Sequence, residues 1–273
     1  MDFKKFSNTY DVRRLENVDV SKIYELCRAN GLYYRYCPPF VTEQSIRDDM
    51  NALPPGKAMD DKYYIGFFDG EDLVAVMDLI NGFPDKETAF IGFFMTKVSV
   101  QNKGVGSHII MGLVDYLRDN GTRYIRLGWV KGNPQAEAFW KKNGFSETGI
   151  TQDADDYMVV LAERALAIGM TVKGKIDRPL GSAHPNYPDM IYPINYGYVE
   201  GVLAGDGEEQ DVYVLGPSNP IEDYEGKVIG VYHRTNDNED KWIVSVDEKD
   251  YSNEEILDLI EFQEKYYEGR LIR

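Results

Sequence analysis

The chain has 273 residues, and its 46 acidic residues outnumber its 30 Lys and Arg, for a formal net charge of −16. This length favours two domains, and the acidic balance excludes a general nucleic-acid binder and argues against binding to anionic membranes. The two cysteines, Cys27 and Cys37, are too few for a disulfide framework or a cysteine-rich zinc site. We expect a cytoplasmic protein, because no signal-peptide core opens the sequence and no run approaches the about 18 apolar residues of a membrane span.

The first hundred residues alternate between helical and strand-like hydrophobic patterns. Ile23, Leu26 and Cys27 recur at helical spacing, and the turn Asp69-Gly70 separates two apolar runs as in a hairpin. In chain order we expect a strand at 9–14, a helix at 20–29, a tyrosine-rich loop at 30–40, a helix from about 42, strands at 63–68 and 73–80, and a third strand at 89–100.

Helices and strands then alternate after a glycine-containing loop at 101–106. A strand at 124–130, a helix from Pro134 to Asn143 and a strand at 156–162 are expected. The helix that follows the loop ends near Gly121 and carries one apolar stripe, made of Ile109, Ile110, Leu113, Val114 and Leu117. Because an antiparallel meander precedes this order, we expect an α/β (α+β) fold whose mixed sheet is flanked by helices.

The pattern changes between residues 163 and 169, where short β runs broken by Gly, Pro and Asp begin. They continue to a helix predicted from Ser252 to about Tyr267. We therefore expect a first domain at 1–163, a linker at 164–168 and a β-rich second domain with a terminal helix at 169–273.

The loop at 101–106 has the composition of an anion-binding loop. Between a strand and a helix, glycines let backbone N–H groups converge on one point, and the helix N-terminus adds attraction for an anion. A purely structural turn would also use glycine. The pattern Gln-x-x-Gly-x-Gly resembles the cofactor loop of the GNAT acetyltransferase superfamily. Asn133 and the segment AEAFWKKNGF at 136–145 resemble the second hallmark of that family.

The resemblance implies acetyl-coenzyme A as the donor cofactor of the first domain. It places the strand backbone of Val98 and Val100, together with Asn133 and Phe139, along the pantetheine arm, although Phe139 could equally be a core aromatic residue. It assigns the pyrophosphate to the loop and the start of the following helix, at Gln101, Lys103, Gly104, Val105, Gly106 and Ser107.

One position departs from the family pattern. Many family members have a Tyr after the helical aromatic residue to protonate the departing thiolate, whereas Trp140 stands here, and an indole N–H is too weak an acid for that role. Acetyl transfer also needs an uncharged amine, hence a base or a water path. Asp78 is the candidate base, and the alternative is a strand-end carboxylate that faces solvent.

The acceptor is a small-molecule or peptide amine that the sequence does not identify. Aromatic residues gather where this family forms its acceptor pocket, and such a lining with acidic surroundings suits a cationic amine. Packing of these loop residues on the core is the alternative. They are Tyr33, Tyr34, Tyr36 and Phe40.

The second domain has carboxylates spaced for a hard cation. Asp206, Glu208 and Asp211 stand at i, i+2 and i+5 around Gly207 and can converge on Mg²⁺, although an acidic loop can show this spacing by chance. With the preceding segment YPINYGY at 192–198, they resemble the signature of soluble inorganic pyrophosphatases.

That resemblance implies a small OB-like β-barrel with a C-terminal helix that binds pyrophosphate or a phosphorylated ligand. The metal positions fall on Asp206, Glu208, Asp211 and Asp240, with Asp237 near Asp240 and Asp177 where the family has a Glu. The phosphate-contacting tyrosines fall on Tyr192, Tyr196 and Tyr266.

The cations of that family are mostly missing. The hairpin between Ser182 and Tyr192 is short and lacks the family's Lys and Arg, and Trp242 and Tyr267 stand where further lysines are expected. Pyrophosphate hydrolysis depends on metals and on cations that neutralise the leaving phosphate. Two alternatives follow: a domain with a different ligand or partner, or a minimal hydrolase that uses Arg178, His184, Arg234 and Lys241.

We therefore expect an acetyl-coenzyme-A-dependent N-acetyltransferase fused to a pyrophosphatase-like domain of reduced or altered activity. The first alternative function is Mg²⁺-dependent hydrolysis of pyrophosphate or another phosphoanhydride by the second domain. The second alternative makes that domain a non-catalytic module that senses a ligand or forms a homodimer.

Overall fold

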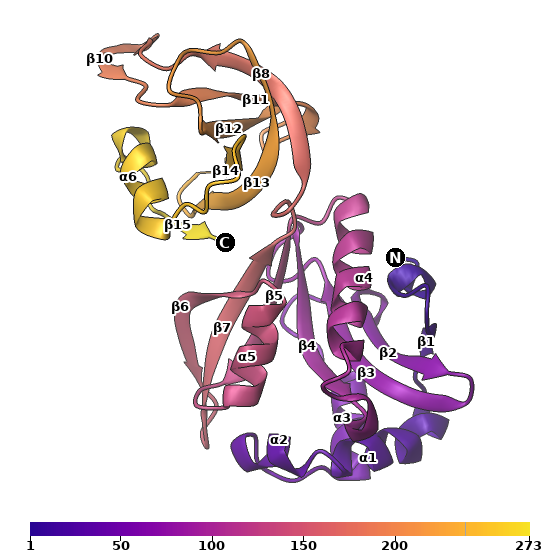
Figure 1. Ribbon diagram of the computed structural model, residues 1–273. Coiled ribbons are helices and arrows are strands. Elements are labelled where there is room, and N and C mark those ends of the chain that lie inside the picture. Colours follow the sequence, from indigo (N-terminus) through magenta and orange to yellow (C-terminus); the bar gives the residue numbers. More distant parts are fainter. Residues whose placement is uncertain (238) are drawn as a thin grey trace. The chain divides into compact units, whose positions relative to one another are not determined.

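The computed structural model describes residues 1–237 and 239–273. The chain divides into two compact units, Met1–Leu166 and Ala167–Arg273 (Figure 1). Among the described residues, none of the helices combines the length and the apolar character that a membrane crossing requires.

The first unit is built on a seven-stranded mixed sheet in the order β1-β2-β3-β4-β5-β7-β6. Only β4 and β5 pair in parallel, and the other neighbours are antiparallel. The predicted mixed α/β architecture is thus confirmed. The strands are β1 (Asp11–Arg14), β2 (Lys62–Asp69), β3 (Asp72–Asn81), β4 (Thr88–Thr96), β5 (Tyr124–Val130), β6 (Ser146–Asp153) and β7 (Met158–Ala165).

Helices cover both faces of this sheet. Alternate residues of β2 enter two different cores, with Ile65 facing one and Tyr64 the other, because successive strand side chains point to opposite faces. One core contains the predicted apolar stripe of α4, and α5 lies over the same face in Figure 1. The other contains residues of α1 and α3. The helices are α1 (Val20–Arg28), α2 (Gly31–Tyr36), α3 (Glu43–Asn51), α4 (Val105–Asp119) and α5 (Pro134–Lys142).

Short 3-10 turns complete the unit. They are η1 (Phe3–Phe6), η2 (Asn17–Asp19), η3 (Met59–Asp61) and η4 (Val98–Val100).

Three sequence-based predictions about these elements were wrong. The tyrosine-rich segment at 30–40 contains α2 and is not wholly a loop. The third strand ends at Thr96 rather than at 100, because η4 bends the chain through the bonds Val100 N–H to Lys97 O (3.0 Å) and Gln101 N–H to Val98 O (3.2 Å). Strand β6 was missed, since it is almost entirely exposed and has no apolar alternation for a pattern to detect.

The second unit is the expected small β-barrel with a C-terminal helix. Strands β14-β12-β11-β8-β13 lie side by side, and a further pairing of β13 with β14 closes the barrel, while β15 adds to β13. Strands β9 and β10 form a separate hairpin. The strands are β8 (Thr171–Arg178), β9 (Ala183–His184), β10 (Tyr187–Ile191), β11 (Asn195–Leu203), β12 (Glu209–Leu215), β13 (Asp223–Arg234), β14 (Lys241–Ser245) and β15 (Gly269–Ile272).

Helix α6 (Asn253–Glu264) packs on the barrel core. Ser252 caps it by accepting a bond from Glu255 N–H, and the Glu255 side chain accepts one from Ser252 N–H (2.8 Å), a reciprocal arrangement typical of helix N-termini. Ile256 and Ile260 are fully buried against the barrel's tyrosines. The helix end thereby brings Glu264 into the interior, where its side chain is 3% exposed.

Candidate functional site

Strands β4 and β5 separate after four paired residues. Their parallel ladder runs from Thr88↔Tyr124 to Ile91↔Leu127, although β4 continues to Thr96. The separation begins at a bulge, because Leu79 of β3 faces Ile91 whereas the preceding Asp78 faces Phe93, which leaves Gly92 as the extra residue. A β-carbon on Gly92 would lie 2.8 Å from the Asp78 carboxylate, so a larger residue here would displace this side chain.

The glycine loop ends at the N-terminus of α4, as the sequence predicts. Gly104 is the N-cap residue in a left-handed conformation (φ 83°), and no side-chain hydrogen bond caps the helix among the described residues. The first intrahelical bond runs from His108 N–H to Gly104 O (2.9 Å), so the N–H groups of Val105, Gly106 and Ser107 have no intrahelical acceptor. These groups and the positive helix end favour a bound anion.

The Gln101 side chain forms hydrogen bonds with other residues of the first unit. Its Nε2 donates to Asn30 Oδ1 (2.7 Å) and to the carbonyl of Thr96 (3.2 Å), and Asn30 Nδ2 donates to the same carbonyl (3.2 Å). The two amides hold the end of β4, the loop and the start of α2 together. Sequence reasoning missed Asn30, because a single loop amide carries no detectable pattern.

Predicted strand contacts at Val98 and Val100 need correction. Both residues lie in η4, so they present no strand backbone to a pantetheine arm. The strand backbone that lies beyond the β4–β5 ladder belongs to Phe93, Phe94 and Thr96, which sequence reasoning did not single out. The error follows directly from the strand end that was placed four residues too late.

Asn133 lies at the start of α5, and Phe139 of α5 contacts this part of β4. Asn133 is the N-cap of α5, with Oδ1 accepting from Ala136 N–H (3.2 Å), and it is 4% exposed. The Phe139 ring stacks on Phe94 with centroids 6.0 Å apart and meets Trp140 edge-on at 4.9 Å. Phe139 is therefore a packing residue at the edge of the core, and a contact to the cofactor stays a prediction.

Trp140 is a core residue. It is 7% exposed and packs edge-on against Phe145 with ring centroids 5.1 Å apart. Its indole thus fills the interior between α5 and the sheet, in agreement with its unsuitability as a proton donor.

Asp78 is buried and paired rather than exposed at a strand end, so the solvent-facing alternative was wrong. Its side chain is 13% exposed, and Oδ2 accepts from the Nζ of Lys62, 2.7 Å away and itself 2% exposed. Oδ1 is buried without a hydrogen-bond partner among the described residues. Burial raises the pKa of Asp78, and the bond to Lys62 opposes this rise. Burial and the nearby Asp78 charge also raise the pKa of Asp49 in α3.

Aromatic rings extend from α2 to the bulge. Tyr33 lies edge-on to Phe93 with centroids 6.0 Å apart and to Tyr34 at 5.0 Å, and Tyr34 lies 4.9 Å from Phe40. Because Phe93 is the strand partner of Asp78, the rings and the carboxylate lie in one region of the first unit.

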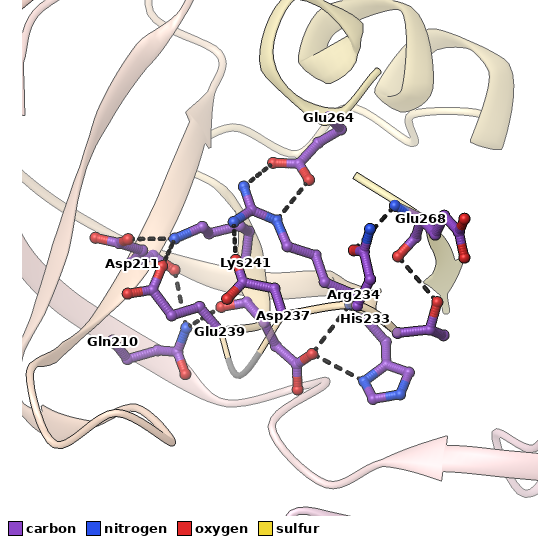
Figure 2. A network of polar contacts seen from close by, with 12 residues as sticks. Gln210, Asp211, His233, Arg234, Asp237, Glu239, Lys241, Glu264 and Glu268 are labelled. Atoms are coloured by element: carbon purple, nitrogen blue, oxygen red, sulfur yellow. Dashed lines mark hydrogen bonds and ion pairs between the residues drawn. The ribbon is translucent and has the colours of Figure 1, made fainter. Parts of the chain in front are cut away.

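In the second unit, one predicted metal ligand pairs with a lysine. Strands β12 and β14 run parallel with Val212 opposite Trp242, which puts Asp211 beside Lys241. The Lys241 ammonium, on a side chain 2% exposed, pairs with both Asp211 and Glu239 (Figure 2). The interaction with Glu239 chiefly lowers the pKa of Asp206, while burial chiefly raises the pKa of Glu239.

A second network in Figure 2 surrounds Arg234, whose side chain is 1% exposed. Its Nε and Nη2 donate to the two carboxylate oxygens of Glu264, each at 2.8 Å, and Nη1 donates to Asp237 (2.8 Å). The Tyr213 hydroxyl also donates to Glu264 (2.5 Å). The centroid of the Tyr267 ring lies 3.5 Å from the guanidinium carbon.

The predicted metal residues do not form one coordination cluster. Asp240 Oδ1 lies 2.8 Å from His233 Nδ1 and accepts from Arg234 N–H (3.3 Å). Glu208 is exposed in the β11–β12 turn. Within residues 1–237 and 239–273, no three His, Cys, Asp or Glu side chains are placed to hold a metal ion.

The predicted phosphate tyrosines lie in different environments. Tyr192 and Tyr196 are 2% and 7% exposed, with ring centroids 5.4 Å apart, whereas Tyr266 is 65% exposed. Burial, then the Asp211 charge, raises the pKa of Tyr196 well above its ordinary value. His184 stacks on Tyr192 at 6.2 Å, which brings one candidate cation residue to these rings.

Two family models match successive parts of the chain. The Acetyltransferase (GNAT) family matches residues 23–145, and Inorganic pyrophosphatase matches residues 165–269. An acetyltransferase structure from Thermus thermophilus aligns with a TM-score of 0.48 and 18% identity, over 57% of this chain and 97% of that one.

Curated relatives of the second unit are inorganic pyrophosphatases. The protein from Saccharolobus solfataricus is 37% identical over 75 residues, or 26% of this chain and 40% of its own length. The protein from Corynebacterium glutamicum is 28% identical over 102 residues, or 34% of this chain. The chain thus spans 40% and 65% of the lengths of these two relatives.

Proposed function

Because residues 23–145 match the GNAT acetyltransferase family and residues 165–269 match inorganic pyrophosphatase, we propose that the protein is an acetyl-coenzyme-A-dependent N-acetyltransferase with an altered pyrophosphatase-like domain. The observation that carries the proposal is the uncapped N-terminus of α4 after Gly104, beside the end of β4. The backbone N–H groups there match the negative charge of a pyrophosphate. Gly106 lets α4 pack closely on the Phe139 ring, because a β-carbon on it would lie 3.0 Å from that ring.

In the proposed reaction, the acceptor amine attacks the thioester carbonyl of acetyl-coenzyme A. A C–N bond forms, the C–S bond breaks, and the amine proton passes to Asp78 directly or through one water. The raised pKa and the unpartnered Oδ1 of Asp78 support this role as base. The thiolate takes a proton from water, since the buried indole of Trp140 is too weak an acid.

A substitution of Lys62 should move the acid limb of the pH profile. The nearby ammonium favours the ionised carboxylate, so Lys62→Met should raise the pKa of Asp78 further. The base works only when deprotonated, and the acid limb of kcat/KM is therefore expected to move upward by about one pH unit or more. Initial rates between pH 5 and 9 measure the shift, while Asp78→Asn should lower kcat by about a hundredfold or more.

Lys57→Met is the matched control, because it removes the same charge from a pair with Asp61 outside the proposed site. Its acid limb should stay that of the wild type. An unmoved limb in an active Lys62→Met enzyme would show that Asp78 is not the base.

We propose a cationic amine as the acceptor. The rings of Tyr33, Tyr34 and Phe40 and the carboxylates of Asp49 and Asp78 would attract an ammonium group and an apolar stem together. Thiol release with a panel of aliphatic di- and monoamines, neutral amides and peptide N-termini tests the class. The proposal of an acetyl-coenzyme-A-dependent enzyme fails if calorimetry shows no binding of acetyl-coenzyme A to the intact protein.

For the second domain we propose reduced or altered pyrophosphatase activity. Tyr192 and Tyr196 lie near Asp211 as in a phosphate site, but the Mg²⁺ expected there does not fit, since Lys241 pairs with Asp211. Phosphate release from pyrophosphate with Mg²⁺ should stay near background and should not differ between wild type and Asp211→Ala. A large rate that Asp211→Ala abolishes would instead favour the hydrolase.

A further inference from the structure

A cation of the chain itself lies among the carboxylates that match metal ligands in the second domain. The ammonium of Lys241 contacts both Asp211 and Glu239 (Figure 2). With its side chain 2% exposed, Lys241 has little water to solvate its charge. A buried ammonium is stable only when paired, so these carboxylates are the groups that keep it in place.

We propose that the Lys241 ammonium takes the place of a divalent cation in this carboxylate cluster, so that the second domain neither requires nor tightly binds Mg²⁺. The inference goes beyond the proposed acetyl transfer and does not depend on it. Its basis is the replacement of one kind of cation by another at the same carboxylates.

The barrel leaves the ammonium little freedom to withdraw. Lys241 is the first residue of β14, which pairs with β12 through Val212↔Trp242 and with β13 through Tyr232↔Lys241. Both neighbouring strands therefore anchor its backbone, and its Nζ also lies 6.0 Å from the Tyr196 ring. A divalent ion bound to Asp211 and Glu239 would have to sit next to this ammonium, where the two positive charges repel each other strongly.

Among the residues that the structure describes, the remaining acidic side chains of the region do not form a metal cluster. Asp240 contacts His233, and Asp237 contacts Arg234, which is itself paired with Glu264. These contacts engage the carboxylates with side chains of the same chain. An ammonium, unlike Mg²⁺, offers no exchangeable coordination positions for water, so a ligand of this domain would be held by hydrogen bonds and charge alone.

Titration of the full-length protein with Mn²⁺, a paramagnetic substitute for Mg²⁺, tests the inference. The wild type should bind Mn²⁺ with a dissociation constant above about 1 mM, as judged by the resonance signal of free Mn²⁺. In Lys241→Met the freed carboxylates should bind Mn²⁺ at least about tenfold more tightly. Lys249→Met is the matched control, since it removes the same charge from an exposed pair with Glu255 and should behave as the wild type.

A second measurement uses the wild type alone and does not depend on the folding of a variant. Its unfolding midpoints should differ by less than about 1 °C between EDTA and about 5 mM MgCl₂, since only a ligand that binds the folded state raises them. A rise of several degrees, wild-type Mn²⁺ binding tighter than about 0.1 mM, or a folded Lys241→Met without a gain in binding would each overturn the inference.

Discussion

Gly104→Glu should weaken acetyl-coenzyme A binding by about a hundredfold or more, which corresponds to about 2.7 kcal/mol. Gly104 has φ 83° at the N-cap of α4, and open space surrounds its missing side chain. A glutamate there would place a negative charge at the N–H groups that we expect to bind the pyrophosphate. Calorimetric titration of wild type and variant measures the loss.

Gly121→Glu separates this charge effect from backbone strain. Gly121 follows α4 at its other end, has the same φ of 83° and likewise has nothing within 4 Å of an added β-carbon. Both substitutions should cost about 1–2 kcal/mol of stability, because a side chain disfavours the left-handed region. Only Gly104→Glu should lose the cofactor. Equal affinities for acetyl-coenzyme A in the two variants would show that the loop at Gly104 does not bind the cofactor.

Arg234→Met should destabilise the second domain by about 3–5 kcal/mol. The guanidinium makes both bonds to Glu264, and the two side chains are 1% and 3% exposed. Its loss leaves a buried carboxylate whose remaining partner is the Tyr213 hydroxyl. Hydrogen exchange of amides in β12, β13 and β14 measures the opening free energy of this domain separately from that of the first.

Two variants test whether the buried charge causes the loss. Arg178→Met removes an arginine that is 32% exposed and paired with Asp177, so it should cost only about 0–1 kcal/mol. Adding Glu264→Gln to Arg234→Met should recover much of the stability, because the neutral amide still accepts from Tyr213 without leaving a charge. If the double variant is no more stable than Arg234→Met, lost packing on Tyr267 explains the effect instead.

Local sequence patterns predicted the elements that bury one continuous face. The predicted apolar stripe of α4 lies at fully buried positions, and the structure adds that Gly104 and Asn133 are helix N-caps. Both family resemblances and the fold class were confirmed. Elements with little burial were harder to predict from the sequence, because they carry no regular hydrophobic pattern. Helix α2 has no buried residue, and β6 is mostly exposed.

The sequence by itself determined most of the order of elements and placed a glycine-containing loop before a helix, since each depends on neighbours within a few positions of the chain. Only the tertiary structure decided the state of the carboxylates. Asp78 meets Lys62 through the pairing of β2 with β3, and Asp211 meets Lys241 through that of β12 with β14. Strand register and burial decide whether a carboxylate faces water, a metal or a lysine, and neither is encoded in the spacing of residues along one segment.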